Sequence, residues 1–470
     1  MSKTLVIAEK PSVGRDVARV LPGPFEKHEG DLEGPEHVIT WAVGHLVQLA
    51  EPEQYDPKFK KWRMADLPIV PDDFKLVVRD ERSKKQMSVV QRLLKRPDID
   101  LVINACDAGR EGELIFAYLF EKAGAKKPVK RLWLSSMTDS AMREAFASLR
   151  DGSEMRRLED AARSRSEADW IVGMNATRAA TIRLRSSFDG AVSLGRVQTP
   201  TLAILARREE EIKAFVPEPY WLVDATFEAS GARSYEGRFH AGSSPRIKTA
   251  DEAAAIVDAV RGQRGTITKL DKTKRKERAP LLYDLTSLQR DANSRFGFSA
   301  RRTLAAAQRL YEEHNALTYP RTSSRFLSSD MIPELQPIAG HVGGAPEYAK
   351  AAAYVQGLDM LPLGRVVNNE KVTDHHAIIP TRSDHKLDKM SSDDRRIYDL
   401  VARRFLAVFH PDAEFENTRI ETTVAEHVFR TRGKVLLVPG WRGVYGELAE
   451  GEGAEGDDEG RDQQDRKSVV

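Results

Sequence analysis

Short apolar runs alternate with amphipathic segments through the first third of the chain. Thr4–Ala8 and Leu101–Ala105 are mostly apolar runs of strand length, and Arg131–Leu134 is a third candidate strand. Helical patterns follow the first two runs. Buried strands separated by helices are typical of a parallel sheet covered by helices. Residues 1–150 are therefore predicted to form an α/β domain.

The hydrophobic pattern changes repeatedly along the rest of the chain. Residues 151–215 are helical and arginine-rich, and residues 216–278 are β-rich. Residues 279–405 are helical again, and residues 406–446 return to strand-like alternation. Residues 447–470 are rich in Gly, Glu and Asp, which predicts a disordered acidic tail. With 470 residues the chain is too long for one core, so we expect several α/β and helical domains.

Composition is that of a protein that folds in water. The chain is 41% hydrophobic and 31% charged, and no apolar run approaches the ~18 residues that a membrane span needs. A single cysteine excludes an intramolecular disulfide and a zinc ribbon of several cysteines. The N-terminus reads as a strand and not as a signal peptide. A cytoplasmic location without a membrane partner is expected.

Charge is distributed unevenly along the chain. The net charge is +2, but residues 447–470 carry nine acids and three bases, a net −6, which leaves +8 for residues 1–446. A basic body is compatible with a polyanionic partner but does not require one.

Acidic and basic side chains follow two of the predicted strands. Glu9 and Lys10 come directly after the first strand, and Asp107 follows the second, with Glu111 and Glu113 beyond it. Ligands of such sheets bind beyond the carboxyl ends of the strands. Carboxylate oxygens suit Mg²⁺, and a carboxylate beside an ammonium suits acid–base chemistry on a phosphate. A helix cap and a surface ion pair explain the same residues.

Two further groups are candidates for contacts with phosphate. His375 and His376 precede an apolar run, and one of them could reach a phosphate. Consecutive strand residues point to opposite faces, so the two rarely bind one metal, and a packed or exposed pair is the alternative. The arginine-rich segment has guanidinium groups suited to a phosphate backbone, although a solvated charged face has the same pattern. The candidates among its arginines are Arg165, Arg178, Arg183, Arg185 and Arg196.

Tyr319 lies between a predicted helix end and Pro320, with Arg321 two residues on. A tyrosine can act as an oxygen nucleophile and hold a covalent intermediate, and an arginine beside it can grip a phosphate. A half-buried tyrosine at a turn is the alternative interpretation.

Five blocks in this order resemble those of type IA DNA topoisomerases, of the bacterial topoisomerase III kind. The resemblance covers residues 1–446, with supporting blocks at 131–136 and 439–441. The five blocks are IAEKPS (7–12), DAGREGE (107–113), SLGRVQTP (193–200), TYPRT (318–322) and HHAIIPT (375–381).

The resemblance implies a mechanism for residues already singled out. Tyr319 would attack a phosphodiester of single-stranded DNA, form a 5′-phosphotyrosyl bond and free a 3′-hydroxyl. Glu9 would be the general acid, and Lys10 and Arg321 would hold the scissile phosphate. The implied Mg²⁺ ligands are Asp107 and Glu111 together with Glu9, and the implied contacts with DNA or the active site are Arg196, Gln198 and His375.

The resemblance also implies a fold and an activity. A toprim domain (1–150) and an arginine-rich domain (151–215, its first part) would join a winged-helix-like domain that bears Tyr319 (279–405). A β-rich hinge from 216–278 and 406–446 would open this toroid. The activity would be ATP-independent relaxation of negative supercoils or decatenation by a monomer. Its partners would be single-stranded, supercoiled or catenated DNA; the sequence names no helicase partner, and it lacks a P-loop, as expected.

Two departures from the family pattern remain. Gly109 stands where many members have a second aspartate, which leaves the number of metal ions open. Members also continue past the Pro-Gly-Trp block and return to the arginine-rich domain, whereas this chain enters its acidic tail. An incomplete ring is therefore expected, and a truncated, catalytically impaired DNA-binding remnant is the alternative function. Another toprim protein, such as a nuclease or primase, does not account for the Tyr319 block.

Overall fold

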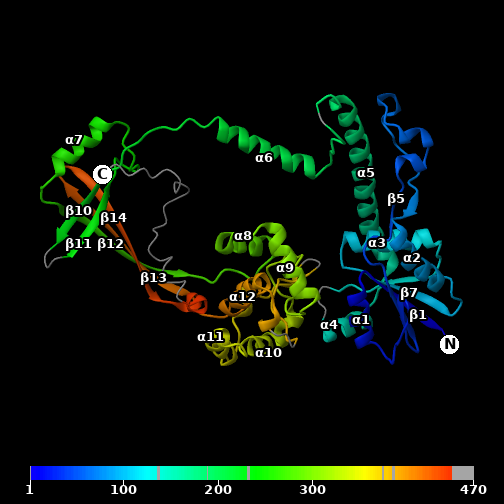
Figure 1. Cartoon of the computed structure of the whole chain (residues 1–470). Helices are drawn as coiled ribbons and strands as arrows, with labels where there is room; N and C mark the ends of the chain where they lie inside the picture. The colour runs from blue at the N-terminus through cyan, green and yellow to red at the C-terminus, as the bar shows by residue number, and fades with distance from the viewer. Residues whose placement is uncertain are drawn as a thin grey trace. The chain divides into compact units, whose positions relative to one another are not determined.

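The computed structural model describes residues 2–134, 138–187, 189–229, 233–372, 375–383 and 387–446. The chain divides into two compact units, each of which is described by itself (Figure 1). Unit 1 comprises Met1–Phe215, Leu327–Ile332 and Asn369–His376, and unit 2 comprises Val216–Phe326, Pro333–Asn368 and Ala377–Val470. The predicted tail 447–470, Asp374, Ser135 and Ser136 lie outside the described residues.

A seven-stranded sheet forms the centre of unit 1, in the order β2-β3-β4-β1-β7-β8-β9. Strands β4, β1, β7 and β8 run parallel, and the strands at the two edges are antiparallel to their neighbours. The bounds are β1 Lys3–Ala8, β2 Glu26–Lys27, β3 Asp31–Glu33, β4 His37–Trp41, β7 Ile99–Ala105, β8 Val129–Arg131 and β9 Arg150–Asp151.

The central strands are apolar because both faces of the sheet are covered. Leu5 and Val102 point into the core on one face, and Val6 and Ile103 point into the core on the other. Successive strand residues alternate between faces, so a strand covered on both sides needs a continuous apolar run. The predicted α/β fold with a parallel sheet is confirmed.

Two strands differ from the prediction. The sequence analysis missed β4, His37–Trp41, which pairs in parallel with β1. The third strand was predicted at 131–134, but β8 covers Val129–Arg131 and ends before Leu132. The error is small, but it moves Arg131 from the start of a strand to its end.

Six helices and a small hairpin complete the described part of unit 1 (Figure 1). In the long helix α5, Trp170 packs into the sheet core and its Nε1 donates to the Ala50 carbonyl (3.0 Å). The bounds are α1 Pro11–Val20, α2 Glu81–Leu94, α3 Arg110–Ala123, α4 Asp139–Ala147, α5 Arg156–Leu184 and α6 Gln198–Lys213, with the hairpin β5 Val47–Leu49 and β6 Leu76–Val78.

Unit 2 contains a five-stranded antiparallel sheet in the order β10-β11-β14-β13-β12. Its strands come from both segments that were predicted to form the hinge. Helix α7 (Ala250–Val260) packs its Ala253 and Ile256 against Phe239 and Phe429 of the sheet. The bounds are β10 Asp224–Ala229, β11 Arg233–Phe239, β12 Thr266–Glu277, β13 Ala413–Val424 and β14 His427–Val438.

Helices form the remainder of unit 2, with α12 as their best-buried member. Isolated bridges, Leu317 to Pro380 and Tyr283 to Ile378, connect the loops of this helical part. The bounds are α8 Leu285–Phe296, α9 Ala300–Glu312, α10 Ile332–Val342, α11 Pro346–Gln356 and α12 Ser392–Ala407. Across the described ranges, no helix has the length and apolar character needed to span a membrane.

Candidate active site

Strands β1 and β7 bring Glu9, Lys10 and Asp107 together at one edge of the sheet. The two strands are parallel and in register, with Ala8 opposite Ala105, so their carboxyl ends meet. Lys10 Nζ lies 3.3 Å from Glu9 Oε1 and 3.1 Å from Asp107 Oδ2. The Asp107 backbone N–H donates to Glu9 Oε2 (3.3 Å). The predicted meeting of these strand ends is therefore observed.

His375 joins the same site from a distant part of the sequence. Its Nε2 lies 3.5 Å from Asp107 Oδ2, and it belongs to unit 1 although its neighbours from Ala377 onward belong to unit 2. The site thus contains an imidazole, an ammonium and two carboxylates.

The pKa values of the Glu9 and Asp107 carboxyl groups are shifted in opposite directions. Burial raises the pKa of Glu9, the charge of Asp107 adds to the rise, and Lys10 opposes it. Burial also acts to raise the pKa of Asp107, but His375 and Lys10 outweigh it and lower that pKa to about 2. Separated pKa values are what a proton donor beside a permanently ionised carboxylate requires.

Helix α3 approaches the Asp107 loop so closely that Gly112 has no room for a side chain. A Cβ atom on Gly112 would lie 2.1 Å from the Asp107 carbonyl oxygen and 2.9 Å from its nitrogen. Because both neighbours are backbone atoms, rotation of a side chain cannot relieve the overlap. Gly112 therefore sets where Asp107 lies relative to α3.

Replacing Gly112 with alanine is expected to shift the Asp107 loop and to destabilise the protein by about 1–3 kcal/mol, the usual range for overpacking. Urea unfolding measures the change. Gly173→Ala on α5 is the matched control, because its nearest atom would be 3.9 Å away and alanine is the better helix former. Equal stabilities of the two variants would show that the loop adapts without cost.

Arg131 holds the same loop through hydrogen bonds to its backbone carbonyls. Its side chain is 1% exposed, its Nε donates to Glu113, and Asn104 Nδ2 donates to Glu113 Oε2 (3.2 Å). Its remaining nitrogens donate at 2.7–3.0 Å to four carbonyls, those of Asn104, Cys106, Asp107 and Leu132. Glu113 is thus the buried counter-ion of Arg131, which explains why this third acid of the motif is present.

Glu111 does not join the two other predicted metal ligands. Its side chain is 67% exposed, and its Oε1 lies 2.6 Å from His45 Nε2. In the described residues, Glu9, Asp107 and Glu111 do not form a group with all ligand atoms within 4.8 Å. Their oxygen donors suit Mg²⁺, which takes one or two carboxylates and keeps several waters. The exposed Glu111 leaves such a site open to water.

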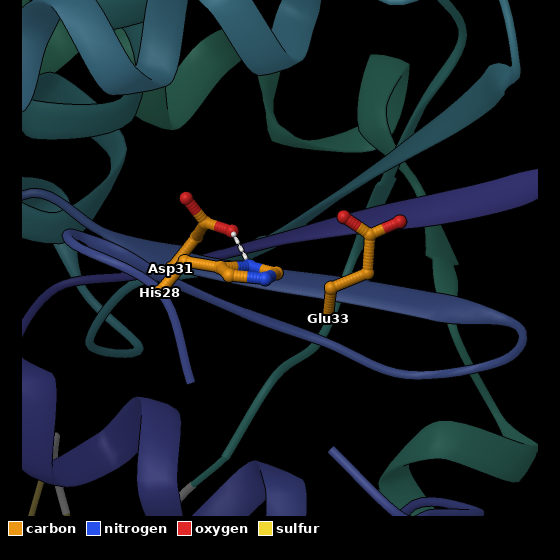
Figure 2. A group of neighbouring side chains, drawn as sticks. All are labelled: His28, Asp31 and Glu33. Atoms are coloured by element: carbon orange, nitrogen blue, oxygen red, sulfur yellow. Dashed lines mark hydrogen bonds and ion pairs between the residues drawn. The ribbon is translucent and has the colours of Figure 1, made fainter. Parts of the chain in front are cut away.

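A tighter group consists of Asp31 and Glu33 of β3 and of His28, which precedes this strand (Figure 2). Its ligand atoms lie within 4.8 Å of one another. Basic side chains already contact both carboxylates. Asp31 contacts His28 Nδ1 (3.1 Å) and Arg92 (2.9 Å). Glu33 contacts Arg96 through both oxygens (2.7 and 2.8 Å) and Lys3 (2.6 Å). This group is an ion-pair network, because its lone pairs are engaged by positive charge.

The network predicts an acid-dependent loss of stability. Hydrogen bonds from Arg96, helped by Lys3, lower the pKa of Glu33 from 4.5 to about 2. Because the folded pKa is depressed, this contribution is fully present above pH 4.5 and is lost as the pH falls toward 2. Glu33→Gln is expected to be less stable at pH 7 and to show a flatter pH dependence of unfolding between pH 4.5 and 2.

The control for this prediction is Glu26→Gln, because the Glu26 side chain is 80% exposed and its ion-pair contact with His28 is long, at 3.6 Å. Thermal unfolding at stepped pH compares the three proteins. Stabilisation of the wild type by added Zn²⁺ or Mg²⁺, absent in Glu33→Gln, would instead identify a metal site.

The Tyr319 loop belongs to unit 2, and hydrogen bonds hold its backbone before and after Tyr319. Thr318 N–H donates to the Ile379 carbonyl and Ile379 N–H donates to Thr318 Oγ1, each at 3.0 Å. Leu285 N–H donates to the Thr322 carbonyl (3.1 Å). Tyr319 itself is half-buried. Its backbone is thus held in place by segments that are distant in sequence.

Helix α9 contacts both candidate side chains of this loop, Tyr319 and Arg321. The rings of Tyr311 and Tyr319 meet edge to face with centroids 5.4 Å apart. Gln308 Oε1 accepts a hydrogen bond from Arg321 Nη2 (3.1 Å). The sequence analysis missed both supporting residues, although their i, i+3 spacing on the helix before the loop is a usable signal.

The predicted DNA-contacting residues of the arginine-rich segment divide into exposed and buried ones. Arg165 and Arg196 are exposed, and both contact Asp169. Gln198 is exposed at the start of α6, and its Nε2 donates to Ser193 Oγ (2.9 Å). Arg178, by contrast, is buried.

The structure corrects the prediction for Arg178. This residue is 4% exposed, its Nη1 donates to the Phe59 carbonyl (2.7 Å), and its guanidinium lies 5.1 Å from the Trp62 ring centroid. A phosphate cannot reach a side chain engaged in this way. Arg178 therefore ties α5 to the segment around residue 60, and we remove it from the DNA-contacting set.

His45, which contacts Glu111, was also not predicted. It lies in the loop after strand β4, which was not predicted either. Had the apolar run 37–41 been recognised as a parallel strand, the rule that ligands bind at carboxyl ends would have indicated the loop after it. Arg131 carried no such signal, because a lone arginine near a strand is normally exposed.

Comparison with known proteins defines the class to which this fold and site belong. Residues 153–464 match the family model described as DNA topoisomerase, and residues 4–137 match the Toprim domain. The chain therefore belongs to the DNA topoisomerase family, and the type IA, topoisomerase III-like resemblance found in the sequence is confirmed.

Individual relatives agree with this assignment. The chain is 45% identical to DNA topoisomerase 3 of Bacillus subtilis (strain 168), over 99% of this chain and 62% of the relative. It is 46% identical to DNA topoisomerase 3 of Bacillus licheniformis, over 95% of this chain and 60% of the relative. The chain thus spans less than two thirds of these relatives.

A solved structure shows the same fold. Full-length topoisomerase I from Thermotoga maritima superposes with a TM-score of 0.65 at 22% identity, over 94% of this chain and 67% of that chain.

Proposed function

We propose that this chain cleaves and religates single strands of DNA through a covalent bond to Tyr319. The observation that carries the proposal is the convergence of Glu9, Lys10, Asp107 and His375 at one edge of the toprim sheet. Family membership adds the expectation that Tyr319 of unit 2 acts with them.

In the proposed reaction, Tyr319 Oη loses its proton to solvent and attacks the phosphorus, and the bond between phosphorus and the 3′-oxygen breaks. Glu9 donates its proton to that leaving oxygen, a role supported by its raised pKa. Lys10 and Arg321 balance the charge that develops on the phosphate. Religation reverses each step and returns the proton to Glu9. The phosphotyrosyl ester conserves the energy of the broken ester, so ATP is not needed.

Mg²⁺ is the proposed cofactor. Asp107 would hold it with help from Glu9, and Glu111 would join them after its exposed side chain turns away from His45. When bound, it would supply positive charge next to the DNA backbone. The ionised Asp107 and the exposed Glu111 have the oxygen donors this ion prefers.

Arg165, Arg196, Gln198 and His375 are the proposed DNA contacts. The first three are exposed on the arginine-rich segment, and His375 lies at Asp107. Proposed substrates are single-stranded DNA and negatively supercoiled or catenated DNA, handled by a cytoplasmic monomer. Binding to phosphates would weaken as salt increases.

The test is a trapping experiment with end-labelled single-stranded DNA and Mg²⁺. After denaturation, DNA labelled at its 3′ end is expected to stay attached to the protein, whereas the 5′-labelled fragment is released with a free 3′-hydroxyl. A 5′-labelled adduct would contradict the proposed polarity. Removal of Mg²⁺ by chelation is expected to prevent strand passage on supercoiled DNA.

A DNA-binding protein without cleavage activity is the second candidate. The observation in its favour is that Glu111 contacts His45 and, in the described residues, does not group with Glu9 and Asp107. Salt-sensitive binding of single-stranded DNA without any trapped adduct would establish it.

A further inference from the structure

Thr318 lies in a short antiparallel contact between two segments of unit 2, residues 316–318 and 377–381. The segments meet at the isolated bridge between Leu317 and Pro380, and Leu317 is only 1% exposed. Backbone groups in such a buried place need hydrogen-bond partners inside the protein. The partners at this contact therefore decide how the two segments lie against each other.

The backbone alone does not make all the hydrogen bonds of this contact. In a regular antiparallel pair, Thr318 and Ile379 would exchange two bonds, with each N–H donating to the other residue's carbonyl. Thr318 N–H does donate to the Ile379 carbonyl (3.0 Å). The Ile379 N–H, however, donates to Thr318 Oγ1 (3.0 Å), and this hydroxyl donates to the Ala377 carbonyl (3.2 Å). The hydroxyl thus takes the place that the Thr318 carbonyl has in a regular ladder.

This exchange of a hydroxyl for a carbonyl affects the backbone of Tyr319. The Thr318 carbonyl belongs to the peptide bond that joins Thr318 to Tyr319, so a regular ladder would hold that peptide against Ile379. With the hydroxyl in its place, the chain leaves the contact directly before Tyr319. On the other side, Pro320 fixes its own φ at about −65° and restricts Tyr319 to extended conformations. The two neighbours together therefore define the direction in which Tyr319 is presented.

We propose that Thr318 is a positioning residue for Tyr319, because its hydroxyl sets the backbone from which the phenolic oxygen approaches the phosphate. The proposal rests on the proposed role of Tyr319 as the nucleophile. The single proton of the hydroxyl is donated to the Ala377 carbonyl, so Thr318 acts on the direction of Tyr319 and not as a donor to DNA. A reacting group displaced by about 1 Å can lose about a hundredfold in rate.

The test compares Thr318→Val and Thr318→Ser in single-turnover cleavage of end-labelled single-stranded DNA with Mg²⁺. Valine keeps the branched shape but cannot make either hydrogen bond, so the cleavage rate constant is expected to fall about 10- to 100-fold. Serine keeps the hydroxyl and is expected to stay within about threefold of the wild type. The Kd for single-stranded DNA should change by less than about twofold in both variants.

Thr381→Val is the matched control. It removes a threonine hydroxyl from the other segment of the same contact, where Thr381 Oγ1 donates to the Asn315 carbonyl, four residues before Tyr319. Its cleavage rate constant is expected to be close to that of the wild type, because the bonds of Thr318 remain.

The rate constant and the final amount of adduct distinguish positioning from a loss of folded protein. Cleavage and religation pass through the same transition state, so a misplaced nucleophile slows both and leaves the final amount of adduct unchanged. Partial unfolding instead lowers the amount of adduct without slowing the molecules that remain folded. If Thr318→Val does not fold, Thr318→Ala supplies the same comparison, because alanine also lacks the hydroxyl.

Four results would overturn the proposal. A wild-type cleavage rate in Thr318→Val, or an equally slow rate in Thr318→Ser, would reject the positioning role while the proposed cleavage stands. A Kd that weakens in parallel with the rate would make Thr318 a contact for DNA instead. The absence of any adduct with the wild type would reject the proposed cleavage and this role with it.

Discussion

Replacing Tyr319 by phenylalanine is expected to abolish the covalent protein–DNA adduct and leave the fold intact. The change removes only the phenolic oxygen, which is the proposed nucleophile. The ring keeps its edge-to-face contact with Tyr311, and the backbone bonds of Thr318 remain. Because the adduct is a bond to that oxygen, its loss should be complete. A denaturing gel with 3′-labelled single-stranded DNA measures it.

Tyr311→Phe is the control for this result. It removes the phenolic oxygen of Tyr311 but keeps the ring, whose centroid lies 5.4 Å from that of Tyr319. Adduct formation should persist in this variant, and both variants should bind single-stranded DNA with wild-type affinity. An adduct that survives in Tyr319→Phe would refute the nucleophile assignment, whereas its absence in the wild type would favour the DNA-binding candidate.

Replacing Arg131 by methionine is expected to destabilise the protein by about 3–5 kcal/mol, the cost of leaving one member of a buried ion pair without its partner. Arg131 is 1% and Glu113 6% exposed at the side chain, so water cannot replace the lost charge. The carbonyls of Asn104, Cys106, Asp107 and Leu132 would also each lose one hydrogen bond. Urea unfolding followed by circular dichroism measures the change.

The double variant Arg131→Met with Glu113→Gln separates the two causes. With the acid neutralised, most of the penalty from the unpaired charge should disappear, and the double variant should be more stable than Arg131→Met alone. If the two are equally unstable, the carbonyl contacts dominate. A loss of less than about 1 kcal/mol in Arg131→Met would show that the pair is not structural.

The meeting of Glu9, Lys10 and Asp107 followed from local sequence alone. Each residue comes directly after an apolar run, and parallel strands place their carboxyl ends at one edge. The same logic, applied to the run at 37–41, would have included His45. The prediction was therefore limited by an unrecognised strand and not by the rule.

Arg178 and Arg165 show that the local sequence does not predict which side chains are buried. Both lie on α5 and look alike in the helical pattern, yet Arg165 is exposed and Arg178 is held by Phe59 and Trp62. The segment that buries Arg178 is more than a hundred residues away in the chain. Helical periodicity describes one face of a helix, but it does not say what packs against that face.

Glu111 and Glu113 also differ in burial, and the motif does not predict this difference. The motif places both acids at the start of α3, but Glu113 turns inward to Arg131 while Glu111 turns outward to His45. Two residues apart on a helix, they point in different directions, and only the neighbouring strands supply their partners.

The sequence by itself determined the toprim-like sheet, the order of the motifs and the family, because continuous apolar strands and chemically specific blocks are properties of contiguous residues. Only the tertiary structure decided which charged side chains are buried and which acids face the site. Burial and pairing depend on residues brought together from distant segments, so their energies are set by packing and not by local pattern.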